Sequence, residues 1–481
     1  MSNEEFYEKE LINHTKKCRY TVQFISILSE LWYVDSVELL LFRKQLVNKN
    51  VNEVLNLIKH ASEFIEKPIS IFDVVEIAKI IKDIYHPPSK IDIGKMVYEY
   101  KLNENKISLK DFVKNQLKDS LDSDRFEPKD VVLYGFGRIG RLLARDLMTN
   151  IGKGSLLRLR AIVTRGEVNE SILEKRASLL RNDSIHGEFQ GTVNVNPINN
   201  SLEINGSTIH VISANSPDEI DYESYGIYDA LVVDNTGAFR DKSSLSTHLN
   251  AKGISKVLLT APGKNIPNIV YGVNHKSYCP DKYAIFSAAS CTTNAITPVL
   301  KVIEDKFGVV SGHLETIHAY TNDQNLVDNL HNKYRRGRAA ALNMVITETG
   351  AGVAVSKTLP VFKGKLTSSA IRVPVPNGSL AILNLKLENA ASKETINNVM
   401  KDFSLEGDLV DQIQYSLSNE LVSSDIVGAS APAIFDSQAT ISNADGTNVN
   451  LYVWYDNEYG YSQQVIKLAR YISKVRRYSY C

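Results

Sequence analysis

VVLYGFGRIGRLLARDLM, residues 131–148, is the stretch that decides the fold. Its first four residues are apolar and predict a short buried strand, and the residues from Arg141 onward are spaced like one face of a helix. The glycines between these parts allow a tight turn and a close approach of a pyrophosphate to the helix N-terminus. Strand, glycine loop and helix in this order predict a dinucleotide-binding domain.

The segments downstream of this stretch alternate between apolar runs and helical patterns. Apolar runs at 156–163, 209–212, 230–233 and 256–259 predict parallel strands of a doubly wound sheet. The loops at 234–237 and 260–263 follow two of these strands, at the carboxyl ends where the ligand crevice of such a sheet lies. We therefore expect an α/β fold of the Rossmann type.

The end of the second predicted strand lacks a feature that NAD-binding domains usually have. An acidic residue is expected there to bind the ribose hydroxyls, but the sequence has Thr164 and Arg165. Arg165 either meets a 2′-phosphate or is a solvated loop residue, and the sequence alone leaves both interpretations open.

A cysteine lies at a second strand-to-helix junction. SCTTN, residues 290–294, follows a run of apolar and small residues and precedes a segment with helical spacing up to Phe307. Amide donors and the positive end of the helix dipole are expected to stabilise a thiolate at Cys291. The alternative is a buried structural cysteine, which the polar neighbours disfavour. His318 lies near the end of a strand-like segment further along the chain, where a polar strand end favours a functional side chain. The alternative interpretation is a buried core histidine.

The composition limits the classes of protein that the chain can represent. Its 481 residues are too many for one ordinary domain, so we expect two or three. A hydrophobic content of 43% and a charged content of 23% are typical of a soluble globular protein. The zero formal net charge and the absence of an apolar run near the about 18 residues of a membrane span argue against nucleic-acid and membrane partners. The four cysteines are far apart in sequence, so we expect no disulfides, no metal site and a cytoplasmic location.

Residues 1–128 differ from the rest of the chain. Gly94 is the only glycine before Gly135, and apolar residues recur at helical spacing. The segments 70–73 and 108–111, SIFD and SLKD, resemble helix capping boxes with aspartate in place of glutamate. This pattern predicts an all-α N-terminal domain of five to seven helices, joined to the rest by a polar linker at 122–128 and separable from it.

From about residue 130 to about 477 the chain resembles phosphorylating glyceraldehyde-3-phosphate dehydrogenase. The motifs that carry this resemblance are GFGRIGR (135–141), NDSIHG (182–187), SCTTN (290–294), HAYTNDQ (318–324), RRGRAA (335–340), TGAG (349–352), RVPVP (372–376) and WYDNEYGYS (454–462). The resemblance implies a Rossmann-type domain at 129–290 and 457–481, an α+β catalytic domain at 291–456 and a homotetramer. The extension at 1–128 lies outside it, so a partner for that segment is unknown.

The resemblance also implies a role for individual residues. Cys291 resembles the nucleophile and His318 the acid/base that activates it. Thr321 and Arg372 resemble the site for the substrate phosphate, with Arg336 as a further phosphate ligand. The implied site for inorganic phosphate consists of Ser290, Thr292, Thr349 and Gly350, and the implied cofactor site consists of Gly135, Phe136, Gly137, Arg138, Ile139, Thr236, Gly237, Thr260 and Asn457.

Some residues depart from the family pattern. Tyr134 replaces the usual asparagine before the glycine loop, and Thr164 with Arg165 replaces the acidic strand end, so NAD and NADP both remain candidate cofactors. The expected activity is reversible oxidative phosphorylation of D-glyceraldehyde 3-phosphate, as in glycolysis and gluconeogenesis. The alternatives are an erythrose-4-phosphate dehydrogenase and a regulatory or interaction protein built on this scaffold.

Overall fold

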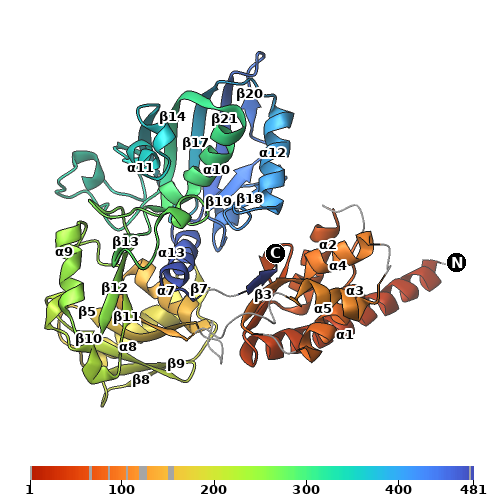
Figure 1. The fold of residues 1–481 in the computed structure, drawn as a ribbon, viewed down its shortest axis with the longest axis horizontal. Helices are drawn as coiled ribbons and strands as arrows, with labels where there is room; N and C mark the ends of the chain where they lie inside the picture. Colours follow the sequence, from red (N-terminus) through yellow and green to blue (C-terminus); the bar gives the residue numbers. More distant parts are fainter. Residues whose placement is uncertain are drawn as a thin grey trace. The chain divides into compact units, whose positions relative to one another are not determined.

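The computed structural model describes residues 3–63, 68–84, 87–103, 107–118, 127–149, 156–475 and 478–480. The chain forms two compact units (Figure 1). The first contains Met1–Pro128, Thr149–Leu157 and Val475–Cys481, and the second contains Lys129–Met148 and Arg158–Lys474. The linker predicted at 122–128 lies outside the described residues up to position 126.

Helices make up most of the first unit. They are α1 (Asn3–Tyr33), α2 (Val51–Glu63), α3 (Ile71–Asp83), α4 (Ile93–Leu102) and α5 (Leu109–Gln116). Both predicted caps are confirmed, because the side chains of Ser70 and Ser108 accept hydrogen bonds from the backbone amides of Asp73 and Asp111. The apolar faces of these helices share one buried core, which includes Leu31, Val75 and Ile81.

The first unit also contains a four-stranded sheet, which corrects the prediction of an all-α domain. Its strands run in the order β2 (Lys44–Gln45), β1 (Val37–Leu41), β3 (Ser89–Asp92) and β22 (Tyr478–Tyr480). Every residue of β1 is buried, so this short apolar run lacks the alternation that marks a half-exposed strand. The strand β22 comes from the end of the chain and pairs in parallel with β3, a pairing that no local pattern can predict.

The second unit begins with the predicted dinucleotide-binding sheet. Its eight strands run in the order β13 (Ile285–Ser287), β12 (Ile254–Leu259), β11 (Ala230–Asp234), β4 (Lys129–Tyr134), β5 (Leu157–Thr164), β10 (Ser207–Ser213), β9 (Ser201–Ile204) and β8 (Val193–Asn196). The pairs β13–β12, β12–β11, β11–β4 and β5–β10 are parallel, as predicted. The same unit also contains the helices α7 (Arg138–Thr149), α8 (Glu170–Arg181), α9 (Lys242–Ser246) and α13 (Tyr459–Ile472) (Figure 1).

A second sheet forms the α+β part of this unit. Its strands run in the order β15 (Val345–Thr347), β16 (Leu366–Val373), β14 (Val309–Ala319), β17 (Ser379–Leu387), β21 (Asn448–Tyr455), β19 (Ala433–Asp436) and β18 (Ile413–Ser416), and β20 (Ile441–Ser442) pairs with β21. The helices α10 (Cys291–Phe307), α11 (Ala351–Thr358) and α12 (Lys393–Leu405) contribute to the core that covers this sheet. The expected combination of a Rossmann-type domain and an α+β catalytic domain is confirmed.

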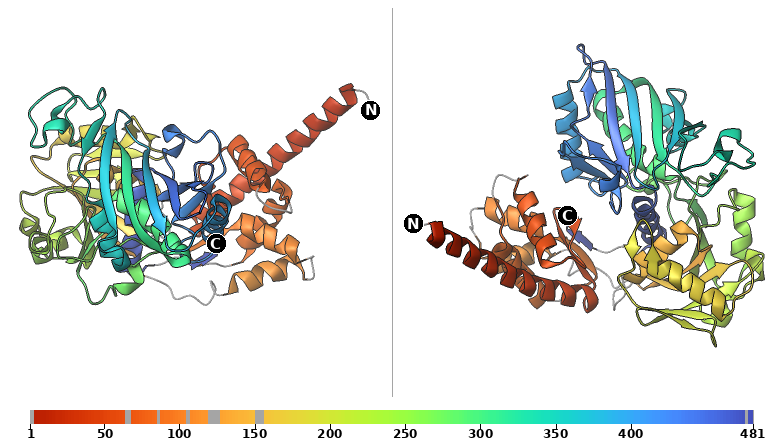
Figure 2. Two further views of the ribbon diagram at one scale, coloured as in Figure 1. Left: turned by 90° about the horizontal axis from the view of Figure 1, so that it is seen from above. Right: turned by 180° about the vertical axis from the view of Figure 1, so that it is seen from behind.

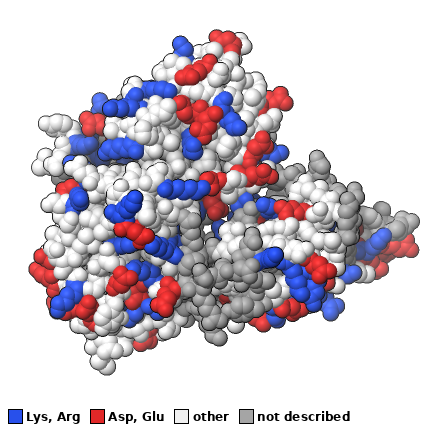
Figure 3. Space-filling view, viewed as in Figure 1, with Lys and Arg blue, Asp and Glu red and all other residues white. Residues whose placement is uncertain are grey.

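Charge and hydropathy add little to this picture. Acidic and basic side chains are interspersed on the face shown in Figure 3. Among the helices that the structure describes, none combines the length and the apolar character needed to cross a membrane. The described residues also bring together no group of three His, Cys, Asp or Glu side chains that could hold a metal ion.

Candidate active site

Cys291 is the first residue of α10, directly after the end of the Rossmann-type sheet. Ser290 caps this helix, since its side chain accepts a hydrogen bond from the amide of Thr293 at 3.1 Å. The helix packs into the core of the second sheet through apolar residues such as Val299 and Ile303. The junction predicted from the sequence therefore holds Cys291 at the start of a helix that packs against the second sheet.

His318 lies next to Cys291. It is the second-last residue of β14, and its Nε2 lies 3.6 Å from the Sγ of Cys291. Its Nδ1 lies 2.7 Å from the carbonyl oxygen of Ala319. Nδ1 also lies 2.9 Å from Nη1 of Arg372, which only donates, whereas the carbonyl oxygen of Ala319 only accepts. We assign the imidazole proton to Nδ1, because the carbonyl oxygen is the closer of these two partners, and this assignment directs the lone pair of Nε2 towards the thiol.

Burial sets the protonation state of this pair. It lowers the pKa of His318 to about 4, helped by the positive charge of Arg372. Burial also raises the pKa of the Cys291 thiol, although Arg372, the Thr292 hydroxyl and the amides at the helix end act in the opposite direction. The direction of this shift opposes the thiolate expected at the helix N-terminus, because the desolvation of the thiol outweighs the donors at the helix end.

Arg372 enters the same site from the neighbouring strand. It lies opposite His318 in the parallel pair β14–β16, and its Nη1 donates to the carbonyl oxygen of Ala319 at 2.9 Å and to the hydroxyl of Thr321 at 3.2 Å. The same Nη1 lies 2.9 Å from Nδ1 of His318. The register of β14 and β16 therefore brings a cation beside the candidate base.

Thr321 and Arg336 meet at a carboxylate. Asp323 accepts short hydrogen bonds from the hydroxyl of Thr321 and from Nη1 of Arg336. Burial alone would raise the pKa of Asp323, but the Thr321 hydroxyl and the charges of Arg372 and Arg336 hold it below its ordinary value. Arg336 also donates to the hydroxyl of Thr347 at 3.1 Å. These donors now surround one anionic group, and they are of the kind that bind phosphate oxygens.

The residues expected to bind inorganic phosphate lie at two helix ends. Thr349 and Gly350 precede α11, and the hydroxyl of Thr349 accepts from the amide of Ala351 at 3.2 Å. A side chain at Gly350 would meet no atom within 4 Å, so the space beside it is open. Thr292 differs, because its hydroxyl is buried and lies 3.0 Å from that of Tyr455. The phosphate roles of these residues and of Ser290 stay predictions.

The glycine loop has the close packing that a dinucleotide requires. Gly135 has φ of +99°, which favours glycine. A Cβ at Gly140 would lie 2.5 Å from the carbonyl oxygen of Gly135, whereas Gly137 faces open space. The amides of Arg138 and Ile139 stand in the first helical turn, where backbone donors remain for a pyrophosphate. The loop residues therefore fit a dinucleotide.

The side chain of Arg138 makes ion pairs within the protein. Its guanidinium group pairs with Asp183 at 2.9 Å and with Glu458 at 2.6 Å. His186 lies 3.0 Å from the carboxylate of Glu458 as well. Arg138 and the amides of residues 185 and 186 hold the pKa of Asp183 well below its usual range, against the effect of burial. This network ties the glycine loop to the segment that carries Asn457.

The remaining cofactor candidates lie at strand ends. The Thr236 hydroxyl donates to Asp234 at 2.7 Å, and the Thr260 hydroxyl donates to the Asp234 carbonyl oxygen at 3.0 Å. Gly237 follows Thr236 with φ of +67°. The hydroxyl of Ser379 donates to Oδ1 of Asn457 at 2.8 Å, which leaves the amide hydrogens of Asn457 available to a ligand.

The comparisons with known proteins match this geometry. Residues 129–242 match the family profile "Glyceraldehyde 3-phosphate dehydrogenase, NAD binding domain", and residues 290–457 match "Glyceraldehyde 3-phosphate dehydrogenase, C-terminal domain". This chain belongs to the glyceraldehyde 3-phosphate dehydrogenase family. It is therefore an oxidoreductase that binds NAD or NADP, and the resemblance found in the sequence is confirmed.

Relatives of this dehydrogenase differ in how much of the chain they match. A "Glyceraldehyde-3-phosphate dehydrogenase-like protein" of Pseudomonas aeruginosa (strain UCBPP-PA14) is 48% identical over 450 residues, which cover 92% of this chain and 97% of the relative. "Glyceraldehyde-3-phosphate dehydrogenase 2" of Trichormus variabilis is 40% identical and "Glyceraldehyde-3-phosphate dehydrogenase 1" of Bacillus subtilis is 39% identical, each over 345 residues, or 72% of this chain and 98% of the relative. The Pseudomonas match is longer than everything downstream of residue 128, so it includes much of the N-terminal unit.

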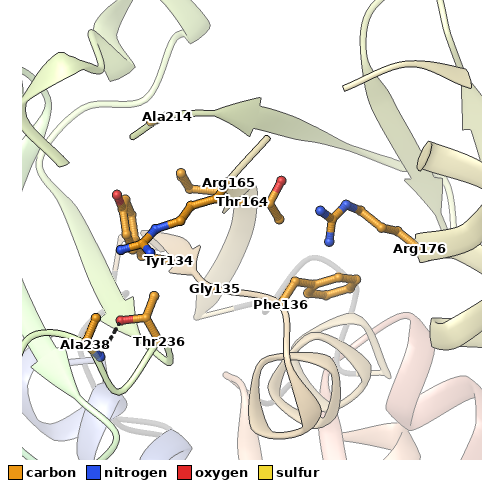
Figure 4. A pocket seen from close by; sticks show the side chains of 10 residues that line it. Tyr134, Gly135, Phe136, Thr164, Arg165, Arg176, Ala214, Thr236 and Ala238 are labelled. Carbon is orange, nitrogen blue, oxygen red and sulfur yellow. Dashed lines mark hydrogen bonds between the residues drawn. The ribbon is translucent and has the colours of Figure 1, made fainter. Parts of the chain in front are cut away.

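The dehydrogenase has a cavity at the carboxyl ends of β4 and β5 (Figure 4). Its volume is about 320 Å³, and its walls are formed by Tyr134, Gly135, Phe136, Val163, Thr164, Arg165, Arg176, Ala214, Thr236 and Ala238. Arg165 and Arg176 lie on opposite sides of it, with Thr164 between them. Nε of Arg176 and the hydroxyl of Thr164 are buried and have no hydrogen-bond partner among the described residues. No carboxylate is among the residues that line this cavity.

Sequence reasoning missed several residues of this site. Arg176 lies mid-helix in α8 among ordinary helix formers, and only its place on the face towards β5 distinguishes it. Tyr455 belongs to the motif at 454–462 but has no predicted role of its own, yet its hydroxyl contacts the hydroxyls of both Thr292 and Thr316. Its neighbours in the sequence, which include Asp456 and Asn457, were the available signal.

Proposed function

We propose that this dehydrogenase oxidises D-glyceraldehyde 3-phosphate with inorganic phosphate to 1,3-bisphosphoglycerate, through a covalent bond to Cys291. The observation that carries this proposal is the 3.6 Å approach of the Cys291 thiol to the lone pair of His318, beside the phosphate-type donors Arg372 and Thr321. The chemistry needs a nucleophile, a base and an anion site, and here Cys291 at the start of α10 lies beside His318 and Arg372, which are partners in the register of β14 and β16.

The chain's own residues divide the work as follows. Nε2 of His318 takes the thiol proton as Sγ of Cys291 adds to the aldehyde carbon, and it gives this proton to the former aldehyde oxygen, which forms the hydroxyl of a hemithioacetal and leaves His318 neutral again. His318 then takes the hydroxyl proton of that adduct as the carbon is oxidised to a thioester. A nicotinamide cofactor bound to the glycine loop supplies the hydride acceptor for this oxidation. Inorganic phosphate attacks the thioester and releases Cys291 as a thiolate.

Arg372 and Thr321 hold the substrate phosphate in this proposal, and Arg336 belongs to the same anion site. The carboxylate of Asp323 accepts hydrogen bonds from Thr321 and Arg336. Like charges repel, so a bound phosphate displaces this carboxylate from Thr321 and Arg336. Ser290, Thr292 and the helix end at Thr349 and Gly350 are the proposed site for the attacking phosphate, since hydroxyls and backbone amides suit a dianion there.

The test is a comparison of two aldehydes with and without phosphate. Reduced cofactor should form steadily from glyceraldehyde 3-phosphate only when inorganic phosphate is present, because the thioester otherwise blocks Cys291. With erythrose 4-phosphate, turnover should be much slower. Faster turnover of erythrose 4-phosphate would assign the alternative substrate, and the absence of turnover with both aldehydes would favour a regulatory protein on this scaffold.

We also propose that NADP is accepted, with its 2′-phosphate bound by Thr164, Arg165 and Arg176. The support is the cavity of Figure 4, in which a buried hydroxyl and the buried Nε of Arg176 lack partners and two guanidinium groups face a space lined by no carboxylate. Arginine binds phosphate oxygens well, and an unsatisfied buried donor costs free energy until a ligand engages it.

Replacing Arg176 with glutamine should lower kcat/KM for NADP by about tenfold to a hundredfold, the range expected when a hydrogen bond to a charged group is lost. The value for NAD should change little. Steady-state kinetics with both cofactors measure this ratio, and Lys175→Gln, an exposed neighbour on α8, is the matched control. Arg165→Asp should shift preference towards NAD by repelling the 2′-phosphate. Equal losses for both cofactors in Arg176→Gln would mean that Arg176 only supports the fold.

The remaining expectations concern assembly and place. We infer a homotetramer that works in the cytoplasm, in glycolysis or gluconeogenesis, because residues 129–242 and 290–457 match the two domains of the family. We propose that residues 129–290 with 457–474 are the cofactor domain and that residues 291–456 are the catalytic domain. The predicted bounds 1–128 and 457–481 are corrected, because Val475–Cys481 belong to the N-terminal unit and β22 joins its sheet. The start of the family match at residue 129 supports the first of these boundaries.

A further inference from the structure

The first half of α1 is less covered by the described part of its own unit than the second half, although Lys16 lies over the ring of Phe72. Residues 4–17 are all exposed, whereas buried positions begin at Thr21 and Phe24. The helix extends beyond the other helices of its own unit (Figure 2). Isolated helices of this length are marginal in water, and most helices owe their stability to packing of one face. A regular helix here therefore points to a contact that a single chain does not supply.

One face of this segment has the spacing of a coiled coil. Tyr7, Leu11, His14 and Cys18 follow one another at intervals of four, three and four residues. Tyr7 is 66% exposed and Leu11 is 51% exposed, although both are large and apolar in character. Cys18 Sγ lies 3.5 Å from Nε2 of His14, so the two side chains lie together on this face. We call these four residues the α1 seam.

Charges are separated along the same helix. Glu4, Glu5, Glu8 and Glu10 lie in its first part together with one base, Lys9, and Lys16, Lys17 and Arg19 lie in its second part, with no acidic residue from 11 to 20. Acidic and basic side chains are both visible at the free end of α1 (Figure 3). Two parallel copies would place like charges side by side. Two antiparallel copies would place each acidic part beside a basic part, so the helix complements itself in that direction alone.

We propose that α1 pairs with α1 of a second copy of this chain, antiparallel and through the α1 seam. In this arrangement Tyr7 faces Cys18 of the second copy, and Leu11 faces its His14. The flanking residue Glu10 lies beside Lys17 of the second copy, and the two-fold axis repeats this ion pair on the other side. Both members are exposed in the single chain, so their pairing requires no burial of an unpaired charge.

Disulfide mapping of the full-length protein tests the direction of pairing. After Tyr7→Cys and mild oxidation, a disulfide should join position 7 of one chain to Cys18 of another. Within one helix these positions are about 16 Å apart, too far for a disulfide, so such a link must be between chains. Tyr7 is exposed, and its replacement spares the core of the unit. The control Tyr7→Cys/Cys18→Ser should lose the link.

Charge exchange gives a second measurement. Glu10→Lys should reduce the yield of the link by roughly three- to tenfold, as repulsion replaces both ion pairs, and Glu10→Lys/Lys17→Glu should restore it. Links from position 7 to position 7, or from Cys18 to Cys18, would overturn the proposal in favour of parallel helices. The absence of any link to position 18, or the failure of the exchanged pair to restore the yield, would overturn self-pairing.

Discussion

Replacing Cys291 with serine is expected to abolish the dehydrogenase reaction. A serine hydroxyl is scarcely ionised near neutral pH, and the neutral imidazole of His318 cannot compensate for the much weaker nucleophile. We expect turnover below about one hundredth of that of the unsubstituted enzyme, given the losses seen when nucleophiles are removed. The measurement is formation of reduced cofactor from glyceraldehyde 3-phosphate and inorganic phosphate.

Two controls separate chemistry from folding in this experiment. Cofactor binding should survive in Cys291→Ser, because the glycine loop and the network around Arg138 do not include the thiol. Cys279 is exposed and offers a matched change, so Cys279→Ser should keep full activity. Turnover of Cys291→Ser above about one hundredth would contradict the assignment of the nucleophile.

Replacing His318 with asparagine is expected to slow the reaction by roughly 100- to 10,000-fold, the usual range for general acid/base catalysis. The change removes Nε2, which lies 3.6 Å from Sγ of Cys291. The thiol, whose pKa is raised by burial, then has no nearby base to take its proton. Alkylation of Cys291 near neutral pH should slow as well. Unchanged alkylation in the variant would show that His318 does not activate the thiol.

The same variant should change how stability depends on pH. His318 is neutral in the folded protein down to about pH 4, but in the unfolded chain it titrates near its ordinary value of 6.5. Between these pH values the unfolded state binds more protons than the folded state, so the free energy of unfolding falls as the pH falls. The contribution of His318 to this free energy is fully present above pH 6.5 and is lost as the pH falls to 4. The loss is about 3 kcal/mol, from a shift of this size. Unfolding of His318→Asn should show a correspondingly weaker dependence over this range.

Local sequence was sufficient to predict those elements whose structure depends on residues that are neighbours along the chain. The glycine loop, the strand ends and the helix that begins at Cys291 all follow from short-range pattern, and the structure confirms their places. The motifs ordered along the chain were sufficient for the family, since they are fixed by one shared chemistry. Ser70 and Ser108 were recognisable as helix caps for the same local reason.

Other features depend on residues that are distant in sequence. The strand Val37–Leu41 is buried throughout and joins a sheet inside a helical segment, so its pattern resembles that of a core helix. Arg138 meets Glu458 across 320 positions, and no periodicity could pair them. The pKa of Cys291 was predicted from the helix end alone, whereas the fold adds a desolvation that the sequence does not show.

The strand β22 has a consequence for how the chain is made. Residues 478–480 pair with β3, and the hydroxyls of Tyr478 and Tyr480 donate to Gln116 and Glu99 in the same unit. During translation β1 and β3 are synthesised before the second unit, and β22 is synthesised after it. The sheet of the first unit is therefore completed later than the fold of the second unit can form, and the edge of β3 that pairs with β22 stays open while residues 129–474 are made.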